Sequence, residues 1–433
     1  MLIALPLTLM PLLDALIAKK MTPVIVGGYV RDTLLHVYSK DIDIEVYGTN
    51  NIETLKTVLN TFGTVHEVGR SFGVLKMRID ELSLDISLPR TESKIAPGHK
   101  GFRVNTAQQL DFSAAARRRD FTINAIGYNT VTDTLLDPYG GQDDLKNGLL
   151  REVDANTFVE DPLRLYRAMQ FAARFNLHIS DSLHRLCRTI VASGELQTLP
   201  KERIFEEFRK LLLNADKPSE GIRLLKAFGA LRYFDELDAM ASQTCRSQKN
   251  LFDHTLLTLD TMASMRRGDA TKDLVAMLAI LCHKMPHEGK TFLHRLTQHP
   301  ALIDAVSTLV RYNRYPQRMY DAQSGSAEIL KLSVNVCIAD LLPVAEAIAR
   351  KCHRHTDHYR FEAGIWLAEK AQALHVFYHP PKPLLQGRDL IAQGLQPSKS
   401  FKTLLNDAYN AQLRQEFTCK SEAIAWLQTY IKR

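Results

Sequence analysis

The sequence predicts an α+β protein, with a small mixed sheet and its helices near the amino terminus and an almost wholly helical region behind them. Between about residues 21 and 150, short apolar runs of strand length alternate with glycine-bearing turns. From about Phe158 onward the apolar residues recur at helical spacing, and strand patterns essentially disappear. A proline-rich run at 380–383 reads as a linker before a last helical segment.

Length and composition indicate a multidomain globular protein that suits a phosphate-bearing partner. The 433 residues are too many for one compact core, and the 45% hydrophobic and 24% charged content is typical of globular chains. The net charge of +7 favours binding to a polyanion, although many basic proteins bind no nucleic acid. We expect four parts, at residues 1–150, 151–214, 215–376 and 377–433.

The cysteines and the apolar start of the chain both favour a cytoplasmic protein. The six cysteines never form CxxC, so we expect free thiols in a reducing compartment. The start resembles a signal peptide only in its apolar content, because Lys19 and Lys20 follow the apolar run and Asp14 interrupts it. Instead, the segment has the spacing of an amphipathic helix. Its apolar stripe can pack on the domain that follows and consists of Leu9, Leu12, Leu13 and Ile17. We expect no membrane association.

A glycine turn is the first candidate ligand-binding feature. In VIVGGYVRDTLL an apolar strand runs into Gly27 and Gly28, and a helical pattern starts directly after them. Glycines let the backbone approach a ligand closely, and the helix N-terminus offers unpaired N–H groups to a phosphate. Arg31 in the first turn can add a charge-assisted hydrogen bond. Taken alone, a tight strand-to-helix turn is the commoner explanation.

Paired carboxylates follow this turn. In Lys40-Asp41-Ile42-Asp43-Ile44 the strand period places Asp41 and Asp43 on one face and the isoleucines on the other. Two carboxylates on one face repel unless a cation lies between them, and Mg²⁺ is the usual one. A further strand carboxylate, Asp85, shares a polar face with serines. Three such carboxylates suit a two-metal centre, with Asp41 and Asp43 as the metal ligands.

The segment VGGYVRDTLLHVYSKDIDIEVYG resembles the signature of the class II tRNA nucleotidyltransferase and bacterial poly(A) polymerase family, within the polymerase-β-like nucleotidyltransferases. The resemblance continues, in order, through RRRDFTINAIGYN, DPYGGQDDLKNGLLR, EDPLRLYRAMQFAARF and KERIFEEFRKLL. It covers residues 1 to about 215 densely and the tail in a second form. It implies a polymerase-β-like nucleotidyltransferase domain with a small mixed sheet, followed by an all-α neck, body and tail.

The resemblance also assigns residues to the nucleotide. Arg118 and Arg119 would hold triphosphate oxygens, Asp120 would accept hydrogen bonds from ribose hydroxyls, and Asn124 would supply a further donor. Three consecutive arginines more often form a solvated surface. Here the run continues directly into an apolar strand pattern, which argues against that explanation.

Base selection is expected from the pair Asp161 and Arg164. A carboxylate only accepts hydrogen bonds and a guanidinium only donates them, so the two together match an amino group beside a bare ring nitrogen. Cytosine and adenine present that edge, whereas uracil and guanine do not. The family resemblance implies this template-like role, with Glu160 bracing Arg164 and Arg167 touching the nucleotide or supporting the pair. The alternative is an acidic helix start with a salt-bridged arginine.

Two further segments of the front half resemble known parts of the family. The polar stretch from Leu88 to about residue 116 matches a flexible lever used in switching from CTP to ATP, with Arg90, Thr91, Glu92, His99 and Lys100 as plausible contributors. A last neck motif, which we interpret as scaffolding, contains Glu202, Arg203, Glu206 and Lys210.

The back half resembles a degenerate HD phosphohydrolase domain. His254 and Asp340 could remain from that motif, but the central pair reads His283-Lys284, which places an ammonium where a metal ligand belongs. We therefore expect a helical body. We expect the segment that contains His353, His355 and His358 to be basic and exposed to solvent. The tail resembles the part of long bacterial tRNA nucleotidyltransferases that grips the tRNA elbow, with its Lys and Arg residues on the RNA backbone.

The sequence therefore predicts a tRNA nucleotidyltransferase that adds CCA to the tRNA 3′ end from CTP and ATP, with Mg²⁺ as cofactor and no implied protein partner. Enzymes restricted to CC or A addition share every motif above and stay open. Poly(A) polymerase ranks third, because such enzymes tend to carry a strongly basic extension after the tail. A catalytically silent RNA-binding protein or an HD-type hydrolase is the alternative from another class.

Overall fold

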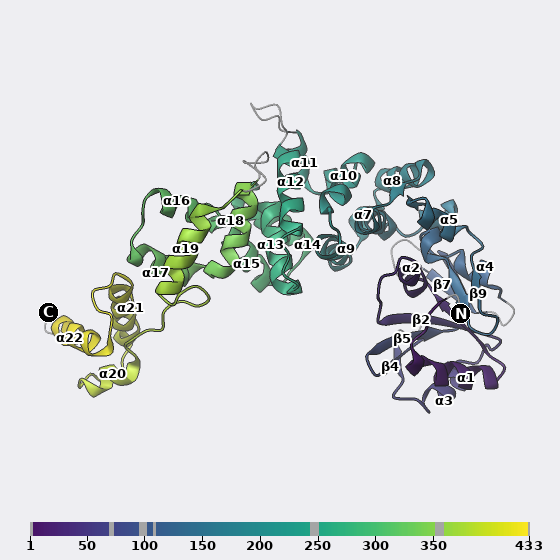
Figure 1. Ribbon diagram of the computed structural model, residues 1–433, viewed down its shortest axis with the longest axis horizontal. Helices are drawn as coiled ribbons and strands as arrows, with labels where there is room; N and C mark the ends of the chain where they lie inside the picture. The colour runs from purple at the N-terminus through teal and green to yellow at the C-terminus, as the bar shows by residue number, and fades with distance from the viewer. Residues whose placement is uncertain are drawn as a thin grey trace. The chain divides into compact units, whose positions relative to one another are not determined.

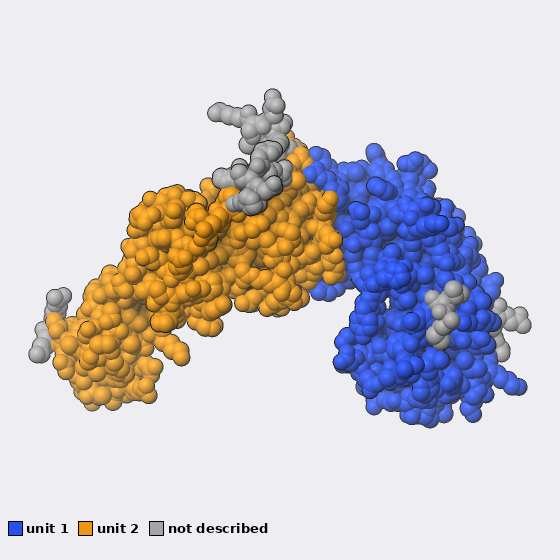
Figure 2. Space-filling model, in the orientation of Figure 1, with its two compact units in different colours: residues 1–211, 220–233 blue, residues 212–219, 234–433 orange. Residues whose placement is uncertain are grey.

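The computed structural model describes residues 3–68, 73–94, 102–106, 110–242, 251–350 and 359–431. The chain folds as two compact units (Figure 2). Unit 1 comprises Met1–Leu211 and Glu220–Tyr233, and unit 2 comprises Leu212–Ser219 and Phe234–Arg433. This division is coarser than the four parts expected from the sequence, which stay a prediction.

Unit 1 is built around a mixed seven-stranded sheet in the order β3-β4-β5-β2-β1-β8-β9 (Figure 1). The strands are β1 Thr22–Val26, β2 Asp41–Tyr47, β3 His66–Val68, β4 Val74–Ile79, β5 Leu82–Ser87, β8 Gly127–Asn129 and β9 Thr134–Leu136. Strands β2 and β5 are parallel and the other neighbours antiparallel, so the mixed sheet expected from the sequence is confirmed.

Strand alternation gives the sheet one apolar face. Along β2 the side chains of Ile42, Ile44 and Val46 are fully buried, and along β5 Leu84 and Ile86 are too. They join one hydrophobic core with helices α1 Met10–Ala18, α2 Gly28–Leu34 and α3 Ile52–Leu59. The polar residues of β2 therefore lie on the opposite face of the sheet.

The start of the chain packs on this core, as its apolar stripe predicted. Leu9, Leu12 and Leu13 are buried. Leu16 takes the fourth core position, and Ile17 is only half-buried. The expected stripe was therefore wrong by one residue at its end, because the helix presents Leu16 one turn after Leu12.

The polar stretch after Leu88 is not entirely a loop. Strand β6 Arg90–Lys94 pairs antiparallel with β7 Phe102–Thr106, in a register that sets Arg90 opposite Thr106. Strand β7 alternates Phe102 and Val104 with polar residues, but β6 contains no apolar residue, so the sequence did not indicate that the two would pair.

Helices complete unit 1. They are α4 Phe112–Ala116, α5 Gly141–Lys146, α6 Ala155–Phe158, α7 Leu163–Phe175, α8 Asp181–Ser193, α9 Lys201–Asn214 and α10 Pro218–Phe228. The end of α9 and the start of α10 fall in the segment 212–219, which belongs to unit 2. One departure from the helical neck is a short parallel bridge between β10 Leu149–Leu150 and β11 His178–Ile179. Its hydrogen bonds tie the chain after α7 back to the end of the head.

Among the described residues of unit 2, all regular secondary structure is helical. Its helices are α11 Asp235–Ser242, α12 Leu251–Ala263, α13 Ala270–Cys282, α14 Lys290–Leu296, α15 Pro300–Tyr312, α16 Tyr315–Asp321, α17 Ser326–Asn335, α18 Ile338–Arg350, α19 Glu362–Ala373, α20 Gly387–Ala392, α21 Ser400–Leu413 and α22 Lys420–Ile431. The last three enclose a small core of their own around Leu390, Phe417 and Leu427. The proline-rich run at 380–383 precedes them without regular structure.

No single helix among the described residues has both the length and the apolar character to cross a membrane. One pair, Ser326–Asn335 with Ile338–Arg350, meets both criteria jointly but is bent by 96°.

Candidate active site

A cavity of about 600 Å³ in unit 1 brings together residues that lie far apart in the sequence. Eleven of the residues expected at the site line it: Gly27, Gly28, Arg31, Asp43, Arg118, Arg119, Asp120, Asn124, Asp161, Arg164 and Arg167. Arg90, Leu163, Phe171 and Arg203 complete the lining, whereas Asp41, Asp85 and Glu160 lie outside it. Arginine thus dominates a cavity that also contains acidic groups, as a site for a phosphorylated ligand requires.

The glycine turn forms one wall of the cavity. Helix α2 begins at Gly28, directly after β1, as the sequence predicted. Gly27 has φ +71°, and a Cβ added there would lie 2.8 Å from Arg119 Nη1 and 3.4 Å from Asp43 Oδ2. Only glycine therefore lets this backbone stand so close to an arginine and a carboxylate.

The carboxylates lie on the polar face of the sheet. Parallel pairing sets Asp43 opposite Asp85 and Asp41 opposite Ser83. Loss of hydration raises the pKa of Asp43, and the charges of Asp85, Glu45 and Asp41 raise it further, while Arg119 opposes them. Since the neighbouring negative charges disfavour the ionised form of Asp43, a cation bound beside this carboxylate would relieve the repulsion.

One of the three expected carboxylates, Asp85, is already paired with a cationic side chain. Asp85 Oδ2 lies 2.7 Å from Lys76 Nζ, so this carboxylate already has a cationic neighbour. In the described part of the chain, no three or more His, Cys, Asp or Glu side chains form a group able to hold a metal ion. The metal-binding role of Asp41 and Asp43 and the catalytic role of Asp85 both stay predictions.

Glu45 is a site residue that the sequence analysis did not identify. Its side chain is 2% exposed, and Oε1 accepts hydrogen bonds from Arg118 Nη2 at 2.8 Å and Arg119 Nη2 at 2.9 Å. Burial alone would raise the pKa of Glu45, but the two arginines outweigh it and hold that pKa below its ordinary value. The strand period was the available signal, since Glu45 follows Asp41 and Asp43 at the same spacing.

Asp120 and Asn124 join two arginines into a buried chain of hydrogen bonds. Asp120 Oδ2 accepts from Arg167 Nε at 2.6 Å, and Asp120 Oδ1 accepts from Asn124 Nδ2 at 3.0 Å. Asn124 Oδ1 in turn accepts from Arg31 Nη1. Burial would raise the pKa of Asp120, yet Arg167 and Asn124 hold it at about 2. The carboxylate is thus ionised and already accepts hydrogen bonds from protein groups.

The pair expected to select the base, Asp161 and Arg164, lies where helix α7 starts. Asp161 lies two residues before the helix, and its Oδ1 accepts a hydrogen bond from Leu163 N at 3.1 Å. Arg164 Nη1 donates to the carbonyl oxygen of Thr157 at 2.8 Å, and Nη2 donates to that of Arg118. Backbone carbonyls thus fix Arg164, and bracing by Glu160 stays a prediction.

Arg203 was expected to be scaffolding but lines the cavity. Its guanidinium, on helix α9, lies 3.7 Å from Asp161 Oδ2, within ion-pair range. The helical period alone could not reveal this, because the partner lies on a preceding loop. Arg90 on β6 also lines the cavity, whereas His99 and Lys100 lie outside the described residues.

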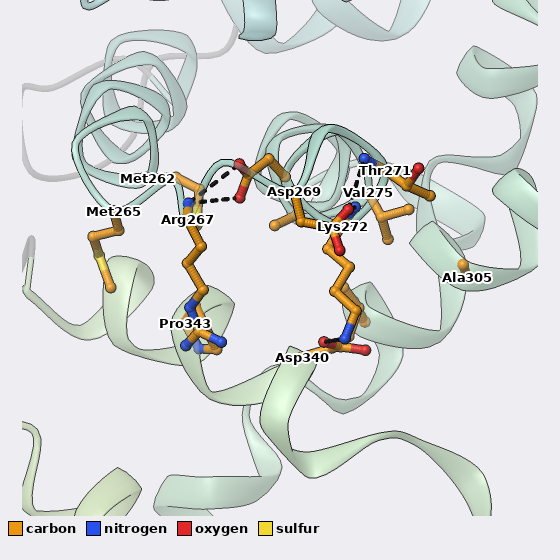
Figure 3. A pocket seen from close by; sticks show the side chains of 13 residues that line it. Met262, Met265, Arg267, Asp269, Thr271, Lys272, Val275, Ala305, Asp340 and Pro343 are labelled. Atoms are coloured by element: carbon orange, nitrogen blue, oxygen red, sulfur yellow. Dashed lines mark hydrogen bonds and ion pairs between the residues drawn. The ribbon is translucent and has the colours of Figure 1, made fainter. Parts of the chain in front are cut away.

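The expected HD remnant does not form a His-Asp centre. His283 Nδ1 hydrogen-bonds the carbonyl of Ile280 at 2.6 Å. Asp340 lies on the wall of a small cavity of about 140 Å³, where Lys272 reaches across to it at 3.1 Å (Figure 3). The Lys272 ammonium is thus the counter-charge of Asp340, and the surrounding region is helical, as expected. His353, His355 and His358 lie outside the described residues.

Comparisons with known proteins agree with this site. Residues 24–151 match the model of the poly A polymerase head domain, and residues 176–240 match a model described as the probable RNA- and SrmB-binding site of polymerase A. The Multifunctional CCA protein of Chromobacterium violaceum is 37% identical over 266 residues, or 60% of this chain and 61% of that protein. That of Nitrosococcus oceani is 35% identical over 281 residues, or 64% and 65%. The chain thus matches less than two thirds of the length of each relative.

Solved structures match over nearly the whole chain. A CCA-adding enzyme with CTP has a TM-score of 0.67 at 20% identity and covers 99% of this chain and 97% of its own. A Thermotoga maritima CCA-adding enzyme in complex with tRNA has a TM-score of 0.62 at 20% identity, covering 97% and 94%. At such identities the likeness establishes the fold, and the predicted fold class is confirmed.

The mixed sheet, the glycine turn and the match over residues 24–151 together define a head domain of the poly A polymerase type. In residues 24–151 and 176–240 the chain is thus similar to the poly(A) polymerase family that these models describe, and over 60% of its length to a Multifunctional CCA protein.

Proposed function

We propose that this protein is a template-independent tRNA nucleotidyltransferase that adds CCA to the 3′ end of tRNA from CTP and ATP. The observation that carries the proposal is the shared cavity, in which Asp43, the arginines and the pair Asp161 and Arg164 meet. The names of the relatives, Multifunctional CCA protein and CCA-adding enzyme, support the same activity.

Nucleotidyl transfer requires phosphate binding and charge neutralisation. Asp41 and Asp43 would hold Mg²⁺, which when bound supplies charge neutralisation at the triphosphate and activation of the attacking hydroxyl. Arg118 and Arg119 would bind the triphosphate oxygens beside the Gly27 turn. Together these groups would orient the nucleotide's α-phosphate toward the tRNA 3′ hydroxyl, with pyrophosphate leaving.

Base choice would rest on Asp161 and Arg164. Asp161 would accept a hydrogen bond from the amino group of cytosine or adenine, and Arg164 would donate to the adjacent ring nitrogen. The two carbonyl contacts of Arg164 support this role, because they hold the guanidinium in one position before a base arrives.

Helices α20 to α22 would bind the tRNA elbow, as predicted from the tail's resemblance. The separate core that these helices form supports their treatment as a distinct binding element. Contacts there would use Lys and Arg against the RNA backbone without reading bases. A cytoplasmic location accords with the free thiols of the four described cysteines.

The decisive assay incubates purified protein with tRNA lacking CCA, tRNA ending in CC and an unrelated RNA, offering single nucleotides and mixtures. We expect two cytidines and one adenosine on the first substrate and one adenosine on the second. Asp41→Ala should abolish transfer while leaving the fold intact, because Asp41 is exposed at the start of β2. Chelation of divalent ions should do the same.

The same assay separates the alternatives. Growth that stops after two cytidines, with no addition to the CC end, would identify a CC-adding enzyme. Addition of adenosine to the CC end alone would identify an A-adding enzyme. Long adenosine tails on any RNA would make the protein a poly(A) polymerase and overturn the proposal.

A further inference from the structure

We infer that Glu45 is the positioning residue of the triphosphate site, holding Arg118 and Arg119 side by side at the cavity. The inference rests on the proposed function, because the phosphate role of the two arginines belongs to it. Glu45 itself does not line the cavity. It would therefore act through the arginines and not on the nucleotide directly.

One carboxylate oxygen organises both guanidiniums. Arg118 Nη2 and Arg119 Nη2 donate to the same atom, Glu45 Oε1, from residues 73 and 74 positions further along the chain. Two adjacent guanidiniums repel each other in a partly desolvated site, and a shared anion removes that repulsion. The contact thus fixes the two cations in one arrangement that a triphosphate can use.

The other side of Glu45 is also held. Tyr47 donates its hydroxyl to Oε2 at 2.9 Å, so both carboxylate oxygens accept hydrogen bonds. The Glu45 side chain is 2% exposed and those of Arg118 and Arg119 are 19% and 14% exposed. The carboxylate is therefore buried behind the arginines, which lie between it and the cavity.

The position of Arg119 is constrained on two further sides. Its Nη1 donates to the carbonyl of Asn124 at 3.3 Å and lies 2.8 Å from the place where a Gly27 Cβ would be. Loss of the Glu45 charge would leave Arg119 free to turn toward Asp43, whose carboxylate lies on the same side of Gly27. The triphosphate would then lose one of its two expected cations.

A buried ion pair of this kind adds little to net stability compared with well-packed apolar residues. The presence of this ion pair beside Asp43 therefore accords better with a positioning role than with a stabilising one. If Glu45 has this role, its replacement should weaken binding of the phosphates and leave binding of the base and the ribose unchanged.

The test compares Glu45→Gln with the parent protein by calorimetric binding of CTP, CMP and inorganic pyrophosphate in the absence of RNA. We expect Kd to rise ~10-fold for CTP and for pyrophosphate, as loss of a charge-assisted contact implies, and to stay unchanged for CMP. In steady-state transfer, KM for CTP and for ATP should rise by the same factor while kcat falls less. Glu67→Gln makes the same chemical change on exposed strand β3, and its binding should equal the parent's.

A second variant keeps the inference testable should Glu45→Gln misfold. Tyr47→Phe removes only the hydrogen bond to Oε2 and should raise Kd for CTP about 2- to 3-fold. Equal CTP affinity in folded Glu45→Gln and the parent would overturn the inference, even if tRNA extension were intact. A Glu45-dependent affinity for CTP and pyrophosphate in a protein that extends no tRNA would uphold the inference while the proposed function fell.

Discussion

Arg167 donates to Asp120 at 2.6 Å across 47 residues of sequence and thereby joins helix α7 to the basic run of the head. Asp120 is 7% exposed, so the carboxylate has little water to replace a lost partner. This ion pair links the element expected to choose the base to the element expected to bind the phosphates.

Asp120→Asn should destabilise the protein strongly. The change leaves the partly buried Arg167 without its nearest counter-charge, which costs about 1–3 kcal/mol of unfolding free energy. Urea unfolding followed by circular dichroism measures it. Glu206→Gln breaks the half-exposed pair with Arg209 and should cost less than about 1 kcal/mol. Similar losses in the two variants would contradict the assignment of Asp120 as a buried structural ion.

Asp161→Ala should relax base selection without abolishing transfer. The variant removes the only acceptor of the base-selecting pair but leaves Asp41 and Asp43 intact, so UTP and GTP should compete with CTP and ATP. One lost hydrogen bond of this kind reduces discrimination about 10- to 100-fold. Single-nucleotide incorporation with each of the four triphosphates measures this ratio. Unchanged selectivity in an active variant would refute the template-like role of Asp161.

The sequence predicted those site residues whose positions follow from the local secondary structure. Asp41 and Asp43 lie on one strand, and the strand period alone places them on one face. Glu45 continues that period, but its burial depends on Arg118 and Arg119, which only the folded sheet brings to it. Arg203 was likewise missed as a cavity residue, because its helix reaches Asp161 through the tertiary fold.

The same limit explains the fold elements that the sequence did not predict. The pairing of β6 with β7 involves one strand, β6, that contains no apolar residue, so only the hydrogen-bond register reveals it. The core position of Leu16 in place of Ile17 reflects the rotation of α1 on the sheet, which neighbouring apolar residues leave undetermined.

Gly27→Ala should impair transfer by more than its effect on stability explains. The positive φ of +71° costs a side chain about 1–3 kcal/mol, and the added Cβ would displace Arg119 Nη1 from 2.8 Å. Gly194→Ala is the matched control, since Gly194 has φ +77° and nothing within 4 Å of the added Cβ. Both variants should lose stability, and only Gly27→Ala should raise KM for CTP. Equal KM values in the two variants would show that the glycine turn does not shape the triphosphate site.

Because of His283, unit 2 should be less stable in mild acid than at neutral pH. Burial lowers the pKa of His283 to about 4 from an ordinary value of 6.5, so the folded state binds fewer protons than the unfolded state between these values. Stability contributed by the neutral ring is present above pH 6.5 and is lost as the pH falls toward 4. The loss between pH 7 and pH 5 is about 2 kcal/mol. Urea unfolding at both pH values should show a smaller difference in His283→Leu than in the parent protein, while His66→Leu, at an exposed strand position, controls for removal of a histidine as such. A pH dependence that is identical in the parent and in His283→Leu would mean that the ring stays neutral in both states or is hydrated in the folded protein.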